Sequence, residues 1–394
     1  MSPLRSTSLH VAIFMPSFAP HDAMAIHALE LRDALREHGL ASAIYAEEIK
    51  SGTGGEAIPF TRFRFTTPSK NRYLLYQAGT GSNLVRHLVA RREPLIIQYH
   101  NITPRQQFVR FEAGIASSMA WGRRQLESLI HHTNLALGIS RFNAEDLIKT
   151  GFTRIAISPP LIRPLPLAKN PRIYGGGGHS LLFVGRLAPN KAHQDLIAAV
   201  AAYNATFVDK VRLYLVGTTV IPAYSSYLEN LAKHLGVENE VIFASSVPSD
   251  ELAAMYAQAH LFVSASLHEG FGFPLIEAMR ASLPVVAVGS SAIPETVADA
   301  AMVTTSGEPE TLATAWHMAL TDGSLRAKLV QRGLKRAAHF DLALTRAANL
   351  AALAYEIPLE SITPAGLYYQ RRLPAIPGNY IVSAAPASAD GFRQ

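Results

Sequence analysis

The sequence predicts an α/β protein with two doubly wound parallel sheets. Short runs of β-branched and aliphatic residues alternate with longer amphipathic stretches, a pattern typical of strand–helix–strand units. The 394 residues exceed one ordinary domain of about 150 residues more than twofold. Five prolines followed by four consecutive glycines, within residues 158–178, divide the pattern into two series. We therefore expect two facing Rossmann-like domains.

The first series contains six runs that we expect to be strands and one stretch that we expect to be a helix. The helix covers residues 26–38 and ends at Gly39, because glycine readily adopts the left-handed conformation that closes helices. The expected strands are residues 9–15, 42–46, 60–65, 95–99, 135–139 and 154–157. This series predicts a first domain over residues 1–165, followed by a linker over residues 166–179.

The second series predicts another domain of the same kind over residues 180–340. Its expected strands are residues 181–184, 211–216, 241–243, 261–264 and 285–288. Its expected helices begin at Lys191 and Pro274 or cover residues 224–235 and 250–258. Ligands of such sheets bind at the carboxyl ends of the strands, so residues that directly follow strands are candidates for chemistry.

Composition narrows the class of protein. Hydrophobic residues make up 48% and charged residues 17% of the chain, which favours a folded protein over a disordered one. The sequence has no cysteine, which excludes disulfides, thiolate zinc sites and thiol catalysis. Residues 1–170 hold 20 Lys and Arg against 12 Asp and Glu, whereas the remainder holds 16 against 18. The basic surplus therefore lies in the first half.

The motif HEGFGFPLIEAM, residues 268–279, directly follows an expected strand. Pro274 suits the first turn of a helix, so the backbone amides before it lie at a helix amino end, where anions bind. We expect these amides to hold a diphosphate, Glu277 to hold ribose hydroxyls and Glu269 to lie at the sugar beyond. The alternative is a structural turn in which Glu277 complements the helix dipole.

Two cations flank the end of another expected strand, in the motif VGRLAPNK at residues 184–191. Arg186 follows the strand and Lys191 opens the next helix. An arginine fork and a lysine point charge would neutralise a leaving nucleoside diphosphate. The alternative is a pair of solvated surface cations.

Three polar residues follow expected strands of the first half. His100 comes after the strand at residues 95–99, and His21 and Asp22 come after the first strand. This position makes His100 a candidate for catalysis, and His21 and Asp22 could help to hold an acceptor. A histidine is more often structural, and Asp22 could equally be a general base or the cap of the helix that follows.

Missing motifs argue against other chemistries. The chain has no Asp-x-Asp pair, which commonly holds a divalent cation beside a diphosphate, and Arg186, Lys191 and the helix end can supply the charge instead. No G-x-G-x-x-G follows a strand and no G-x-x-x-x-G-K-[ST] occurs, which argues against dinucleotide oxidoreductases and P-loop proteins. We therefore expect neither a metal nor a cofactor.

In sequence order, these motifs resemble those of the retaining, nucleotide-sugar-dependent glycosyltransferases of family four (group 1), which have the GT-B fold. The similarity is densest over residues 181–303 and includes VGRLAPNK, HLFVSASLHEGFGFPLIEAM, LPVVAV and SSAIPETVADAA. In the first half it is weaker and rests on YHNITP, LGIS and the SPP at residues 158–160. The chain departs from the family at residues 21–24, HDAM, where a glycine pair usually follows the first strand.

The resemblance implies a role for each motif. Arg186 and Lys191 would contact the donor diphosphate, and Glu277 would hold the ribose. Glu269 would lie at the transferred sugar, over which His100 would reach. The implied donor site also includes Gly270, Phe271, Gly272, Phe273, Pro274 and Leu275. In such enzymes the leaving phosphate is held to help remove the acceptor proton on the same face, so no separate base is implied.

The end of the chain also resembles the family. Residues 341–356 are similar to the helix that packs back on the first domain in these enzymes. Residues 357–394 contain several prolines and are expected to be a loosely structured tail.

The expected activity is that of a retaining, metal-independent hexosyltransferase. YHNITP and the loop LVGTTVIPAY look closest to mannosyl- and related hexosyltransferases of bacterial surface-polysaccharide assembly, which favours GDP-mannose as donor, with UDP-hexoses next. The expected acceptor is a glycan or a polyprenyl-linked saccharide. The alternatives are another GT-B activity, such as a sugar phosphorylase or a nucleotide-sugar epimerase, and a noncatalytic nucleotide-sugar-binding subunit.

The basic surplus of the first half suggests a further partner. Basic and aromatic residues are interleaved there, which suits anionic headgroups; an ordinary solvated face is the alternative. They are Arg62, Arg64, Lys70, Arg72, Arg91, Arg92, Arg105, Arg110, Arg123 and Arg124, with Phe63, Phe65, Tyr73, Phe108, Phe111 and Trp121. No recognition helix or aromatic RNA motif accompanies them, so we expect no nucleic acid. No apolar run approaches the about 18 residues of a membrane span, so the expected location is cytoplasmic, with peripheral attachment at the inner membrane face.

Overall fold

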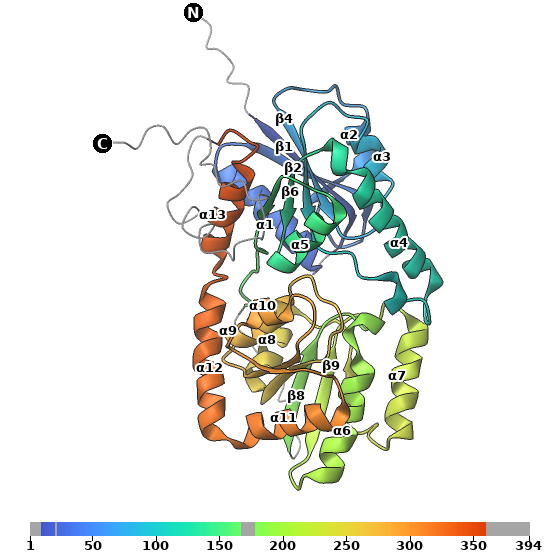
Figure 1. Cartoon of the computed structure of the whole chain (residues 1–394), viewed down its shortest axis with the longest axis vertical. Coiled ribbons are helices and arrows are strands. Elements are labelled where there is room, and N and C mark those ends of the chain that lie inside the picture. Colours follow the sequence, from blue (N-terminus) through green and yellow to red (C-terminus); the bar gives the residue numbers. More distant parts are fainter. Residues whose placement is uncertain (1–8, 20–21, 167–177, 360–394) are drawn as a thin grey trace, which may run out of the picture. The chain divides into compact units, whose positions relative to one another are not determined.

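The computed structural model describes residues 9–19, 22–166 and 178–359. The chain divides into two compact units, each built around its own parallel sheet (Figure 1). Unit 1 comprises Met1–Ile102, Ser118–Arg163 and Phe340–Gln394, and unit 2 comprises Thr103–Ser117 and Pro164–His339.

Unit 1 has a seven-stranded sheet in the order β3-β2-β1-β4-β5-β6-β7, with every neighbouring pair parallel. The strands are β1 (His10–Phe18), β2 (Ala41–Ile49), β3 (Ala57–Pro59), β4 (Arg72–Ala78), β5 (Leu95–Tyr99), β6 (Thr133–Gly138) and β7 (Ile155–Ile157). The helices are α1 (Ala23–Glu37), α2 (Phe60–Arg64), α3 (Leu84–Leu88), most of α4 (Ala113–Ser128), α5 (Arg141–Thr150) and α13 (Leu342–Leu353). The central strands are almost wholly buried, which is typical of a parallel sheet covered on both faces.

Unit 2 has a six-stranded sheet in the order β10-β9-β8-β11-β12-β13, again parallel throughout. The strands are β8 (His179–Val184), β9 (Val211–Val216), β10 (Val241–Ala244), β11 (Leu261–Ser264), β12 (Val285–Val288) and β13 (Met302–Thr304). The helices are α6 (His193–Thr206), α7 (Pro222–His234), α8 (Ser249–Gln258), α9 (Phe273–Arg280), α10 (Ile293–Val297), α11 (Pro309–Thr321) and α12 (Gly323–Ala338), and η3 (Pro189–Lys191) is a 3₁₀ turn. Both units therefore have the predicted doubly wound α/β architecture.

Residues 60–65 are not the strand that the sequence predicts, because most of this segment forms the short helix α2. Phe60 and Phe63, three positions apart, are buried, whereas the side chain of Phe65 is 84% exposed. In a strand, Phe63 and Phe65 would face the same side of the sheet. The ring of Phe63 packs edge-on against that of Phe14, with 4.7 Å between centroids, and this burial favours the helix.

The segment Thr103–Ser117 belongs to unit 2, although the sequence predicts a first domain that includes it. The ring of Phe111 lies against those of Tyr224 and Tyr227 on α7, with centroids 5.0 and 5.4 Å apart. The guanidinium of Arg110 lies 5.2 Å from the ring centroid of Tyr227. These aromatic contacts account for the different boundary. Most of the expected linker and tail lies outside the described residues.

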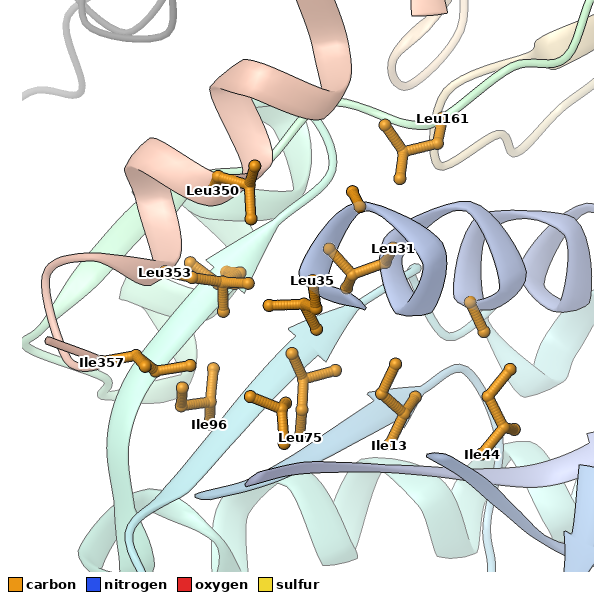
Figure 2. Close-up of a cluster of buried hydrophobic side chains, with 14 of the residues drawn as sticks. Ile13, Leu31, Leu35, Ile44, Leu75, Ile96, Leu161, Leu350, Leu353 and Ile357 are labelled. Carbon is orange, nitrogen blue, oxygen red and sulfur yellow. The ribbon is translucent and has the colours of Figure 1, made fainter. Parts of the chain in front are cut away.

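The helix α13 completes the core of unit 1. Its apolar residues and the turn after it lie among buried side chains of α1 and of the sheet (Figure 2). The labelled side chains of this cluster include Leu31, Leu35, Leu75, Ile96, Leu350, Leu353 and Ile357. Arg346 on α13 forms ion pairs with Glu30 (2.6 Å) and Glu37 (3.1 Å) of α1. Segments from opposite ends of the sequence thus share one core.

Candidate functional site

The sequence motifs of unit 2 come together at one edge of its sheet. Because β8, β9, β11 and β12 are parallel, their carboxyl ends lie at the same edge. The segments that leave these strands carry Arg186, Gly217, Glu269 and Ser291 in turn. Contacts between these segments determine how the candidate side chains are held.

Close backbone packing braces the segment that carries Arg186. A Cβ atom on Gly217 would lie 2.0 Å from the carbonyl oxygen of Gly185, so no side chain fits there. The N–H of Leu187 donates a hydrogen bond to the carbonyl oxygen of Thr218 (2.9 Å). Arg186 itself is exposed. Its side chain therefore extends from a well-packed backbone at the end of β8.

Lys191 and Glu269 form an ion pair. The Nζ atom of Lys191, at the end of η3, lies 2.6 Å from Oε1 of Glu269. Each side chain is only 16% exposed, so the attraction is screened less than in a pair on the open surface. The structure thus brings together the cation expected at the diphosphate and the carboxylate expected at the sugar.

Further hydrogen bonds hold Glu269 from two sides. The N–H of Leu267 donates to the carbonyl oxygen of Asn190 (2.9 Å), and Nδ2 of Asn190 donates to the carbonyl oxygen of His268 (3.2 Å). The N–H of Glu269 donates to Oγ of Ser291 (2.7 Å). Ser291 has a φ of +47°, which is uncommon for a residue with a side chain. The carboxylate is therefore positioned by η3 and by the segment after β12.

The helix α9 begins directly after the glycine-rich loop. Gly272 precedes its first residue with a φ of +94°, and a Cβ atom there would lie 2.7 Å from Cδ1 of Leu275, so glycine is required. The carbonyl oxygen of Phe271 accepts a hydrogen bond from Oγ1 of Thr296 (2.5 Å). Phe271, Gly272 and Leu275 are buried, and Gly270, Phe273 and Pro274 are partly buried. The first N–H groups of a helix have no partner within it, so this end carries partial positive charge.

Glu277 lies on α9, partly buried, and the hydroxyl of Tyr256 on α8 donates to its Oε2 (2.8 Å). Burial raises the pKa of Glu277, although the Tyr256 hydrogen bond and the Arg280 charge act in the opposite direction. Burial also raises the pKa of Tyr256, so this phenol stays protonated and remains a donor. A carboxylate accepts several hydrogen bonds, and Glu277 therefore keeps capacity for ligand hydroxyls.

His100 lies in unit 1, at the carboxyl end of β5. Its backbone N–H donates to the carbonyl oxygen of Ala78 (2.8 Å), and its ring Nε2 is hydrogen-bonded to Oε1 of Gln77. The ring packs edge-on against that of His27, with 5.1 Å between centroids. Burial, and to a lesser extent the nearby His27, holds the pKa of His100 well below its ordinary value. The imidazole is therefore uncharged at neutral pH.

The two other candidates of unit 1 have different outcomes. The Asp22 carboxylate accepts hydrogen bonds from the N–H groups of Met24 (2.9 Å) and Ala25 (3.3 Å). Of the two roles open to Asp22, the structure therefore supports that of helix cap. His21 lies outside the described residues.

Sequence reasoning missed the side chains that position the two carboxylates. Tyr256 lies 21 positions from Glu277, and Ser291 lies 22 positions from Glu269. A strand separates the members of each pair, so no local spacing indicates the contact. Ser291 belongs to the motif SSAIPETVADAA, which was a signal for its importance but not for its partner.

Two of the basic residues proposed for a membrane surface are structural instead. The guanidinium groups of Arg72 and Arg91 lie 5.3 and 5.0 Å from the ring centroid of the buried Phe63. Both pair with Glu93, at 3.5 and 2.5 Å, and that side chain is 1% exposed. These cations are therefore committed to holding the fold.

Other residues of that set face solvent. Phe65 is 84% exposed, and the guanidinium of Arg64 lies 5.7 Å from its ring centroid. Trp121 is 36% exposed. Among the helices of the described ranges, none is long and apolar enough to cross a membrane.

Comparison with known sequences finds similarity over the second half of the chain. The model of the family "Glycosyl transferases group 1" matches residues 175–336. The D-inositol 3-phosphate glycosyltransferase of Corynebacterium glutamicum (strain R) is 33% identical over 175 residues, which are 43% of this chain and 42% of that protein. The O-antigen chain mannosyltransferase B of Escherichia coli is 29% identical over 159 residues, 40% of this chain and 41% of that protein. The match thus spans less than half of the length of these curated relatives.

Solved structures resemble the chain over most of its length. WaaG, a glycosyltransferase involved in lipopolysaccharide biosynthesis, has a TM-score of 0.65 at 17% identity, over 87% of this chain and 98% of that one. HepE of Anabaena in complex with UDP-glucose has a TM-score of 0.68 at 18% identity, over 88% and 99%. At such identities the likeness establishes the fold, which is that of the GT-B glycosyltransferases.

The family match and the site of unit 2 coincide. The matched range contains Arg186, the ion pair of Lys191 with Glu269, and Glu277 on α9. The structural similarity extends over both units. Residues 175–336 are therefore similar in sequence to the group 1 glycosyltransferases, and the chain has the GT-B fold.

Proposed function

We propose that this chain transfers a hexose from a nucleoside diphosphate sugar to a glycan or polyprenyl-linked saccharide, with mannose from GDP-mannose as the favoured donor group. One observation carries the proposal: Lys191, Glu269 and the amino end of α9 meet at one edge of a Rossmann-like sheet. Positive charge at this edge suits a diphosphate, and carboxylates suit the hydroxyl groups of ribose and sugar.

Each side chain has a part in the proposed reaction. Arg186, Lys191 and the first amides of α9 stabilise the charge that develops on the leaving diphosphate. Glu277 accepts hydrogen bonds from the ribose hydroxyls. When the diphosphate engages Lys191, Glu269 is released from its ion pair and accepts a hydrogen bond from the transferred sugar. The ion pair thus keeps both groups in place before the donor arrives.

The transfer is proposed to retain the anomeric configuration and to need no metal. The bond between the anomeric carbon and the diphosphate oxygen breaks while the acceptor oxygen bonds to the same face of that carbon. The acceptor proton passes to the leaving phosphate, so the products are the glycoside and the nucleoside diphosphate. NMR of the first-formed glycoside distinguishes retention from inversion. Undiminished transfer after exhaustive EDTA treatment is expected, and loss restored by Mg²⁺ or Mn²⁺ would contradict metal independence.

The donor is best identified by assaying GDP-mannose and UDP-glucose side by side. The mannosyltransferase named above supports mannose, whereas HepE, bound to UDP-glucose, supports a UDP-hexose as the alternative donor. We expect release of GDP from GDP-mannose in the presence of a saccharide acceptor extract. Release of UDP alone would move the proposal to UDP-hexoses. No release from either donor, together with no binding of GDP or UDP, would refute a glycosyltransferase.

A noncatalytic nucleotide-sugar-binding subunit is the remaining alternative. The presence of both cations and both carboxylates favours an enzyme, since altered site residues would be the usual sign of lost catalysis. A single-turnover experiment with excess enzyme over labelled GDP-mannose separates the two. Binding without label transfer to acceptor would support the noncatalytic alternative.

We further propose a cytoplasmic location, with peripheral contact at an anionic membrane surface. The exposed Phe65 beside Arg64 supports such a contact, because an aromatic ring and a cation together suit the headgroup region. In liposome sedimentation, we expect Phe65→Ser to lower binding to anionic vesicles. Val208→Ser is the matched control, because Val208 is 93% exposed on unit 2. No salt-sensitive binding of the wild-type chain would refute the contact.

A further inference from the structure

A line of hydrogen bonds crosses the interior of unit 1 from α13 to His100. Its four intermediate side chains are Gln77, Gln98, Ser158 and Asn349, which we call the amide relay. All four are fully buried. Gln77 and Gln98 lie opposite each other on the adjacent strands β4 and β5. Polar side chains buried this deeply need partners, so the direction of each bond is constrained.

Asn349 sets the direction at one end of the relay. Its Nδ2 lies 2.7 Å from the carbonyl oxygen of Pro159 and 2.8 Å from that of Thr345. Backbone carbonyls only accept hydrogen bonds, so the amide group that faces them must be the NH₂. The Oδ1 atom of Asn349 therefore faces Ser158, and the Ser158 hydroxyl donates to it.

The donor and acceptor roles of the other relay residues follow from that of Asn349. The only hydroxyl hydrogen of Ser158 is used towards Asn349, so Ser158 accepts from Nε2 of Gln98 (3.2 Å). Gln98 then presents Oε1 to Gln77, whose Nε2 donates to it (3.1 Å). Gln77 in turn presents Oε1 to Nε2 of His100. An amide oxygen only accepts, so His100 must carry a hydrogen on Nε2.

The protonation of the other ring nitrogen, Nδ1, follows from the neutral charge of the His100 ring. Burial holds the pKa of His100 far below neutrality and lowers the pKa of the neighbouring His27 to about 4. A neutral imidazole has one N–H, so Nδ1 of His100 carries a lone pair. Across the described residues, Nδ1 takes part in no hydrogen bond. Nδ1 is thus an acceptor to which no described residue donates, at the carboxyl end of a central strand.

We propose that Gln77, Gln98, Ser158 and Asn349 are positioning residues that hold His100 as its Nε2-protonated tautomer, so that Nδ1 accepts a hydrogen bond from a saccharide hydroxyl. A lone pair repels a diphosphate oxygen and attracts a hydroxyl hydrogen, which sets the kind of group that His100 selects. The hydroxyl's identity rests on the proposed function, whereas the tautomer does not. In this proposal, Asn349 acts through the relay on a group far from it in the sequence.

The tautomer can be measured directly in the full-length chain. Two-bond nitrogen–hydrogen correlation spectra of protein labelled with ¹⁵N-histidine distinguish the two neutral tautomers, and His100→Asn assigns the signal. We expect a protonated Nε2 and an unprotonated Nδ1 at neutral pH. A protonated Nδ1, or a charged ring, would overturn the proposal even if the chain proved to have no transferase activity.

Variants of Gln77 test the relay itself. Gln77→Met removes the acceptor beside Nε2, and we expect signals of the Nδ1-protonated tautomer to appear. Gln77→Glu keeps an oxygen acceptor there, so Nε2 should stay protonated. Gln125→Met is the matched control, because the side chain of Gln125 hydrogen-bonds only to Ser82 among the described residues and lies outside the relay. An unchanged His100 spectrum in Gln77→Met would refute a positioning role. If this variant does not fold, Asn349→Ser is measured in its place, and an unchanged His100 spectrum in that variant would refute the role.

The ligand is tested by titration. GDP-mannose, UDP-glucose and a saccharide acceptor are added separately, and the Nδ1 signal of His100 is followed. A shift with one nucleotide sugar, but not with GDP or UDP alone, assigns the hydroxyl to the transferred sugar; a shift with the acceptor alone assigns it to the acceptor. Binding of a donor and an acceptor with no shift from either would refute the hydroxyl contact while leaving the proposed function intact.

Discussion

The ion pair between Lys191 and Glu269 neutralises two partly buried charges with one contact. Neither side chain is fully exposed, so removing one partner leaves the other partly buried without its counterion. The ion pair also holds the ammonium group of Lys191 in place before any ligand binds. Substitutions at this pair should therefore lower stability as well as slow catalysis.

We predict that Lys191→Ala slows transfer while the protein remains folded. Loss of a charge that stabilises the leaving diphosphate costs about 10²-fold in kcat by analogy with lost transition-state donors. Steady-state kinetics with the identified donor measures the effect. Lys328→Ala, which removes an exposed lysine of α12, is the control and should keep the wild-type rate. Wild-type kcat in Lys191→Ala would contradict the role given to this residue.

We predict that Glu277→Gln weakens nucleotide binding about tenfold, which corresponds to about 1.4 kcal/mol, because the amide loses charged acceptors for the ribose hydroxyls. Calorimetric titration with GDP and UDP measures this change. Glu229→Gln on the exposed face of α7 should leave the affinity unchanged. Equal affinities of the wild type and Glu277→Gln would remove Glu277 from the ribose site.

The same variant should have a distinctive pH dependence. Burial raises the pKa of Glu277, so the folded protein binds a proton more readily there than the unfolded chain does. The wild type should therefore gain stability relative to Glu277→Gln as pH falls through the raised pKa, and lose it as pH rises. Denaturant unfolding of both proteins across this range measures the difference. A constant difference in unfolding free energy would show that the carboxyl group is not perturbed.

At the scale of elements, the exits of β8 and β9 depend on one glycine contact. We predict that Gly217→Ala destabilises unit 2 by about 2 kcal/mol and lowers activity further, because a Cβ atom would collide with the backbone of Gly185 and displace Arg186. Gly323→Ala is the control, since a Cβ atom there meets nothing within 4 Å. Thermal unfolding and kinetics measure both effects. Equal stability and activity of the two variants would mean that the segments after β8 and β9 can move apart without loss of stability.

The sequence predicted those elements whose hydrophobic runs are long or bounded by clear signals. The strands at residues 95–99 and 211–216 were located from their apolar runs to the residue, because sheets buried on both faces require such runs. The short helix α2 was mistaken for a strand, since five residues are too few to separate the two periods. The strands β3, β4 and β13 went unpredicted; β4 begins with Arg72 and Tyr73, and β3 and β13 have three residues each.

The candidate site was predictable only in part, because sequence patterns show local structure but not contacts between distant segments. Gly272, Pro274 and the charged residues follow strands or open helices, so their local pattern indicates a site. Tyr256, Ser291 and the amide relay act across distances in sequence that no spacing rule covers. Their roles follow from the topology of the sheets, which brings the ends of distant strands together.

At the scale of the molecule, the last described helix should be essential to unit 1. We predict that Leu353→Ala destabilises this unit by about 3 kcal/mol, because Leu353 is fully buried in its core. Leu344→Ala on the same helix is the control, since Leu344 is 38% exposed. Hydrogen exchange should show the loss in unit 1, while unit 2 keeps its protection and its nucleotide affinity. Equal loss in both units would mean that they unfold together.

The packing of α13 on unit 1 delays the completion of that unit's core during synthesis of the protein. The chain emerges from the ribosome in the direction of synthesis, so β1 to β7 emerge long before α13, the helix that covers part of their sheet. Nearly all of unit 2 is synthesised in between, and its main segment is continuous. Unit 1 can therefore complete its core only after unit 2 has been synthesised, and until then the apolar face that α13 covers is exposed to chaperones and to aggregation.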